Sequence, residues 1–123
     1  MSELEQLRND LNSTIDALTK TAVRLKQSAR LSVEKSADYE QLKSNYKIQL
    51  AAEDTASGAK ARTVSLIESM YRLKFAHERL MANLAKIEHD TDVLLFKGLQ
   101  AKLNALQTVA RLSESEMRMG AHI

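Results

Sequence analysis

Residues 64–94 read VSLIESMYRLKFAHERLMANLAKIEHDTDVL, and this stretch decides the fold that we expect. Within it, one set of positions recurs at alternating steps of four and three residues: Leu66, Met70, Leu73, His77, Leu80, Leu84, Ile87, Thr91 and Leu94. This spacing keeps side chains on one helical face and is the heptad pattern of packed helices. We therefore predict that this face forms the core or oligomer seam, with His77 buried in it. A proton-linked switch at His77 is the alternative.

A second apolar face lies beside the first. It contains Val64, Ile67, Tyr71 and Phe75. A helix with two apolar faces must bury both, against two neighbours or inside a bundle. One thin hairpin cannot cover every such face, so we expect a homo-oligomer.

The N-terminal half predicts one long helix over about residues 2–53. Ser2 and Glu5 match a capping box, in which side chains satisfy the unpaired N–H groups of the first turn. The apolar stripe that follows is Leu4, Leu7, Leu11, Ile15, Leu18, Ala22, Leu25 and Ala29. Serines then accumulate around Ser32, which leaves open whether the helix bends there.

Asp54–Gly58 contains the first glycine of the chain and predicts a chain reversal over about residues 54–60. Glycine relieves the steric penalty of the left-handed conformation that often ends a helix. The alternative is a continuous helix with an internal glycine, at a cost of about 1 kcal/mol. With the reversal, a second helix is expected over about residues 61–89.

His89–Asp92 predicts the start of a third helix, over about residues 91–118, because Asp and Thr favour helix N-caps. The apolar stripe shifts by one residue around Gly98, as at a kink or a change of register. A frayed tail is expected over residues 119–123. The predicted fold is a single elongated all-α domain over residues 1–123, either a long antiparallel helical hairpin or a coiled-coil-like bundle.

Composition argues against several classes of protein. The chain has 123 residues, no Cys, no Pro and a formal charge of +2. It therefore lacks disulfides and thiolate metal sites, and the N-terminus has no apolar signal region. No apolar run approaches the length that spans a membrane. We expect a cytoplasmic protein with no membrane association.

The sequence contains no motif for catalysis, a cofactor or a metal. There is no Gly-x-Ser-x-Gly elbow and no glycine-rich phosphate loop. The three histidines, His77, His89 and His122, are not spaced as metal ligands on one helix. We expect no enzymatic activity.

Basic residues cluster in two stretches, which a groove for phosphates or for an acidic partner would explain. The alternative is an ordinary solvated helical face, favoured because no aromatic residues interleave these bases for stacking. The candidate residues for binding an anionic partner are Lys20, Arg24, Lys26, Arg30, Lys60, Arg62, Arg72, Lys74 and Arg79.

Three segments, Tyr46–Leu50, Met70–Leu80 and Leu99–Leu112, resemble small helical proteins of unassigned role from tailed bacteriophages and prophages. In those proteins a Leu-Gln precedes a basic turn and a Glu-Met, similar to Leu106-Gln107 ahead of Arg111 and Glu116-Met117 here. The resemblance covers about residues 40–118. It implies an origin in early phage regions that carry recombination and replication genes, and a place in the host cytoplasm.

Together these features predict a non-enzymatic interaction protein. It would associate with itself and bind a replication, recombination or host-defence protein. One alternative is a nucleic-acid-binding accessory that uses the basic helical faces. Another is a structural or scaffold component of the virion.

Overall fold

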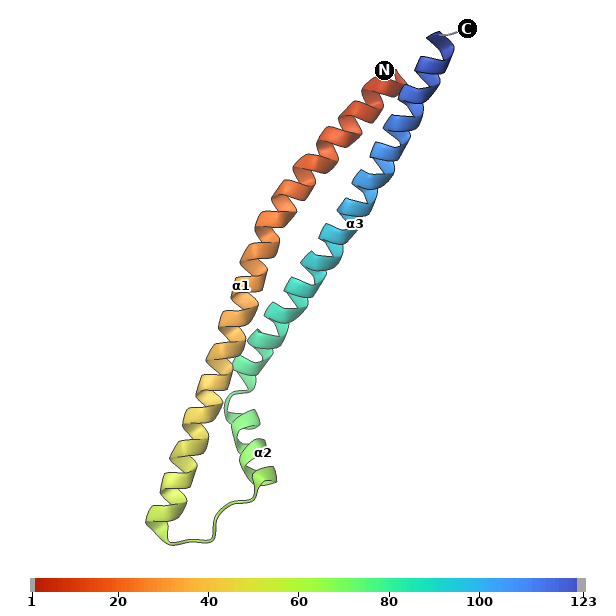
Figure 1. Cartoon of the computed structure of the whole chain (residues 1–123). Coiled ribbons are helices and arrows are strands. Elements are labelled where there is room, and N and C mark those ends of the chain that lie inside the picture. The colour runs from red at the N-terminus through yellow and green to blue at the C-terminus, as the bar shows by residue number, and fades with distance from the viewer. Residues whose placement is uncertain (1, 122–123) are drawn as a thin grey trace. The chain divides into compact units, whose positions relative to one another are not determined.

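The chain folds into helices joined in a hairpin. The computed structural model describes residues 2–121. Its helices are α1 (Glu3–Ser57), α2 (Val64–Lys74) and α3 (Ala76–Ala121), and no strand occurs in that range. Helices α1 and α3 run in opposite directions and pack against each other (Figure 1). This arrangement confirms the predicted all-α helical hairpin.

The contacts of the chain fall into two compact units, where the sequence predicts a single domain. The first, here called the terminal unit, combines Met1–Gln27 with Asp90–Ile123. The second, the central unit, consists of Ser28–His89. The terminal unit pairs the first half of α1 with most of α3, and the central unit holds the rest of both helices and all of α2.

The beginning of α1 and its end follow the capping residues of the sequence. The Glu5 N–H donates to Ser2 Oγ at 3.1 Å, as the first half of a capping box requires. Helix α1 ends at Ser57, beyond the predicted end at about residue 53, so residues 54–57 of the predicted turn are helical. Gly58 follows with φ of +67°. The predicted reversal at this glycine is confirmed, because the backbone adopts the left-handed conformation that glycine accepts most readily.

The segment after Gly58 is tied back to the end of α1 by Arg62. Its N–H donates to Asp54 Oδ2 at 3.3 Å, and its Nη1 lies 3.2 Å from Asp54 Oδ1. Thr63 then caps α2, since Thr63 Oγ1 accepts a hydrogen bond from the Leu66 N–H at 3.2 Å. Helix α2 therefore begins at Val64, three residues after the predicted start.

The helix predicted over residues 61–89 is interrupted at Phe75, which is a correction. Phe75 leaves helical geometry (φ −108°, ψ 29°) between α2 and α3. Its N–H still donates to the Tyr71 carbonyl, and the Arg79 N–H to the Phe75 carbonyl, both at 2.9 Å. Phe75 also meets the Tyr46 ring of α1 edge to face, with centroids 5.5 Å apart. We attribute the break to this tertiary packing, since neither Gly nor Pro is present to signal it.

The predicted start of a third helix at residue 91 is wrong, because α3 continues through His89–Asp92. Asp92 is buried and pairs with Arg24 of α1, so its carboxylate is not used as an N-cap. The helix also passes Gly98 without a break and ends at Ala121 rather than at residue 118. Residues 119–121 of the expected frayed tail are thus helical, and residues 122–123 lie outside the described part.

The terminal unit is held together by a heptad seam. Covered positions of α1 recur at steps of four and three, with Asp10, Ala17 and Ala22 half-buried beside them: Leu7, Leu11, Thr14, Leu18, Thr21 and Leu25. Those of α3 show the same steps: Asp92, Phe96, Leu99, Leu103, Leu106 and Ala110. Two members of the predicted α1 stripe, Leu4 and Ile15, are instead exposed. The strict heptad from Leu7 instead places Thr14, rather than its neighbour Ile15, in the seam, and it adds Thr21 next to the half-buried Ala22.

In the central unit, α2 and α3 both cover α1. Leu50, Tyr71, Ala82 and Ala85 are its buried apolar residues. Small side chains such as these alanines permit close approach of two helices. Tyr71 supplies a large apolar surface, and its ring lies beside Lys43 and Lys47 of α1.

Candidate interaction surfaces

The predicted α3 seam points away from α1. Leu80, Leu84 and Ile87 are 54%, 49% and 60% exposed, whereas Ala82 and Ala85 are buried and His89 is half-buried. Successive helical residues are rotated by about 100°, so the two sets lie on opposite sides of α3. The predicted periodicity therefore exists, but α1 covers the other side of the helix.

The remaining members of the predicted seam are also largely uncovered. Leu66 and Leu73 of α2 are exposed, and Met70 is half-buried. Leu94, which belongs to the terminal unit, is exposed. His77 is exposed as well, so the single chain does not bury this predicted seam histidine. The break at Phe75, just before it, takes α2 and α3 out of one continuous helical register.

The predicted second face is the one that packs inside the central unit. Tyr71 is buried, Ile67 and Phe75 are half-buried, and Val64 is exposed. Lys43 and Lys47 of α1 lie 5.0 Å and 5.3 Å from the Tyr71 ring centroid. A hydrogen bond with the Tyr71 side chain raises the pKa of Lys43 above its usual value of 10.5. These contacts fix α2 on α1.

The basic residues predicted to bind an anionic partner are mostly engaged within the chain. In the terminal unit, Lys20 pairs with Asp16 at 3.0 Å, and Arg24 pairs with Asp92 at 3.4 Å. Lys26 is exposed.

The central unit shows the same behaviour. Arg30 pairs with Glu34 at 3.0 Å, Arg62 pairs with Asp54, and Lys74 Nζ lies 4.5 Å from the Tyr46 ring centroid. The other three candidate bases of this unit, Lys60, Arg72 and Arg79, are exposed. Most of the candidate basic side chains therefore contact acids or aromatic rings of the chain itself. This favours the interpretation as ordinary solvated helical faces over a groove that binds phosphates.

Helix α1 carries a row of buried hydroxyl side chains that the apolar periodicity of the sequence does not predict. Thr14, Thr21 and Ser28 are all buried and follow one another at intervals of seven residues. Thr14 Oγ1 donates to the Asp10 carbonyl at 2.7 Å, which satisfies its donor inside the helix. Their spacing of seven residues is the sequence feature that indicates a shared helical face. A pattern based on apolar residues alone does not include them, because their side chains are polar.

Polar contacts cross between α1 and α3 in both units. In the terminal unit, the Arg24 side chain is 61% exposed and reaches the Asp92 carboxyl, which is only 5% exposed. In the central unit, Ser28 Oγ and His89 Nδ1 lie 3.3 Å apart. Polar groups at seam positions can fix the register of packed helices.

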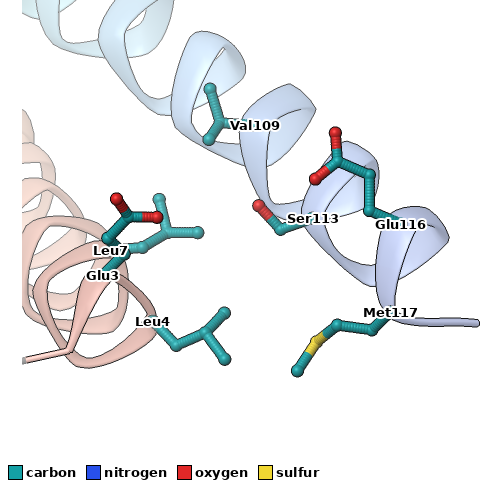
Figure 2. Close-up of a pocket in the computed structure, with 7 residues that line it drawn as sticks. All are labelled: Glu3, Leu4, Leu7, Val109, Ser113, Glu116 and Met117. Carbon is teal, nitrogen blue, oxygen red and sulfur yellow. The ribbon is translucent and has the colours of Figure 1, made fainter. Parts of the chain in front are cut away.

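The terminal unit contains a hollow between the first turns of α1 and the last turns of α3. Its volume is about 380 Å³, and Figure 2 shows Leu4 and Met117 pointing toward one another across it. The carboxylates of Glu3 and Glu116 come from opposite walls. The residues that line this hollow, here called the acidic groove, are Glu3, Leu4, Leu7, Val109, Ser113, Glu116 and Met117.

A second hollow of about 450 Å³ adjoins the acidic groove and shares Glu3, Leu7 and Val109 with it. Its wall also includes Asp10 and Leu106. Neither hollow is lined by a lysine or an arginine. Among the described residues, this end of the terminal unit therefore combines apolar walls with carboxylates and has no lysine or arginine in the lining.

A smaller hollow in the central unit has a mixed lining. Its volume is about 250 Å³, and it is bordered by Lys35, Asp38, Glu78 and the exposed His77, among others.

No group of three or more His, Asp or Glu residues in the described range could hold a metal ion. In the same range, no helix combines the length and apolar character that crossing a membrane requires.

Comparison with known proteins identifies no relative of this chain. No model of a protein family matches the chain, and no curated protein or solved structure matches it significantly.

Proposed function

We propose that this chain is a non-enzymatic helical interaction protein that associates with itself through the outer face of α3 in the central unit. The observation that carries the proposal is the exposure of Leu80, Leu84 and Ile87 on the side of α3 opposite its buried alanines. A helix that is apolar on two sides needs two neighbours, and the hairpin supplies only one.

The energetic gain from covering this face is appreciable. Each of the three side chains is about half exposed. Burying the rest of each contributes about 1 kcal/mol per side chain, and a two-fold interface counts every contribution twice. The same face on a second copy is a complementary partner, because leucine and isoleucine at heptad spacing interlock with their own kind.

Sedimentation equilibrium at micromolar concentration tests the proposal. We expect the unaltered chain to sediment at a multiple of 13.8 kDa. Leu84→Glu places a charge at the centre of the face, so it should shift the mass to that of one chain. Helicity measured by circular dichroism should stay unchanged, because Leu84 contributes little to the hairpin itself.

Ser44→Glu is the matched control, since it adds the same charge at an exposed position of α1 in the central unit rather than on the outer face of α3. This variant should retain the mass of the unaltered chain. A mass of 13.8 kDa for the unaltered protein, or equal dissociation by both variants, would contradict the proposal.

The class of partner beyond a second copy follows from the resemblance to phage-encoded helical proteins alone. On that basis we propose a replication, recombination or host-defence protein. Copurification with the tagged chain from infected cells tests this part, and recovery of only the chain itself would count against it.

A further inference from the structure

We propose that the acidic groove of the terminal unit binds a basic amphipathic helix of a partner protein. This surface is separate from the outer face of α3 in the central unit, and the proposal does not depend on self-association there. The walls of the acidic groove come from the first turns of α1 and the last turns of α3.

The shape of the groove suits a helix. Its α3 wall is formed by Val109, Ser113, Glu116 and Met117, which recur at the spacing of one helical face. These positions extend over about two turns, or roughly 12 Å along the axis. The α1 wall is formed by Glu3, Leu4 and Leu7. Grooves between two helices receive a third helix through apolar side chains spaced three or four residues apart.

The apolar part of the groove is available for contact. Leu4, Val109 and Met117 are all exposed, although they face one hollow (Figure 2). Methionine adapts its shape to varied partners, as at other binding surfaces that accept helices. An apolar side chain of a partner helix placed between Leu4 and Met117 would remove both from water.

The negative charge of the groove favours a positively charged partner. Glu3 and Glu116 stand on opposite walls, and neither forms an ion pair with a described residue. By contrast, Glu114, two residues before Glu116, pairs with Arg118 at 2.7 Å. Asp10 adds a third carboxylate in the adjoining hollow, and no base lines either one.

This local excess of acid contrasts with the composition of the whole chain, which has more bases than acids, 18 against 16. A partner helix that carries Lys or Arg beside its apolar row would complement the two carboxylates. Charge complementarity of this kind governs the choice of partner and the association rate.

Fluorescence anisotropy tests the proposal with the full chain and a labelled model peptide of leucine and lysine, whose leucines fall on one helical face. We expect saturable binding that weakens as salt is raised. A matched leucine and glutamate peptide should not bind. The double variant Glu3→Gln with Glu116→Gln should raise the Kd about fivefold, as expected for two partly solvated ion pairs.

The control is the double variant Glu68→Gln with Glu88→Gln, which removes the same charge from the central unit. Its Kd should equal that of the unaltered chain. Met117→Asp should abolish binding without loss of helicity. Absence of binding to the basic peptide, or an equal effect of the two double variants, would overturn the proposal.

Two further outcomes would also overturn it. If the glutamate peptide binds as well as the lysine peptide, the carboxylates do not select the partner. If Met117→Asp reduces the mass of the assembly in sedimentation, a second copy occupies the groove instead. The variant Leu84→Glu separates the two surfaces, because it should abolish self-association and leave peptide binding intact.

Discussion

Gly58 is the residue on which the reversal after α1 depends. Its φ of +67° is unfavourable for any residue with a Cβ, by about 1 kcal/mol. An added Cβ would meet no atom within 4 Å, so this backbone penalty is the only cost. We expect Gly58→Ala to lower the free energy of unfolding by about 1 kcal/mol, measured by urea denaturation.

Gly98 provides the control for that measurement, since it lies in α3, is exposed and also has free space around it. Alanine there removes conformational freedom of the unfolded chain without strain in the folded one. Gly98→Ala should therefore raise the free energy of unfolding by about 0.5–1 kcal/mol. Changes of the same sign in both variants would show that φ at Gly58 is not the deciding difference.

Asp92 and Arg24 allow a second test at the scale of single residues. The Asp92 carboxyl is nearly fully buried at a seam position, whereas the Arg24 side chain remains largely in solvent. Removing Arg24 alone leaves a buried carboxylate without its partner, which is costly. We expect Arg24→Met to destabilise the chain by about 1 kcal/mol, a figure reduced from that of buried pairs because Arg24 is exposed.

The double variant Arg24→Met with Asp92→Leu should recover this loss, because leucine continues the apolar seam between His89 and Phe96. Urea denaturation of the two single variants and the double variant completes the thermodynamic cycle. If Arg24→Met and Asp92→Leu act additively, the two side chains do not interact and the pair has no part in fixing the seam.

At the scale of elements, the sequence predicts helix type and the first reversal well. Ser2 and Gly58 act through local backbone chemistry, which a sequence displays directly. The break at Phe75 depends on the Tyr46 ring of another helix, so no local signal announces it. His89–Asp92 presents the opposite case, because residues with good capping chemistry lie inside α3 and contact α1 instead.

The choice between the two faces of α3 could not be made from apolar periodicity. Leu80, Leu84 and Ile87 form the more hydrophobic row, yet Ala82 and Ala85 face α1. Small side chains permit closer approach of two helices. In the terminal unit, the small polar residues Thr14 and Thr21 of α1 likewise occupy buried positions. The acidic groove was likewise hidden, since its walls are separated by about a hundred residues.

At the scale of the whole molecule, the exposed outer face of α3 should make the free energy of unfolding depend on protein concentration. If two copies must associate to cover the outer face of α3, unfolding includes dissociation, and mass action stabilises the folded state as protein is added. For a homodimer that unfolds with dissociation, each tenfold rise in concentration adds about 1.4 kcal/mol per dimer. Thermal unfolding over a wide concentration range should therefore show a rising midpoint. Leu84→Glu should remove this dependence and Ser44→Glu should retain it. A constant midpoint for the unaltered chain would mean that its helices fold without a second copy.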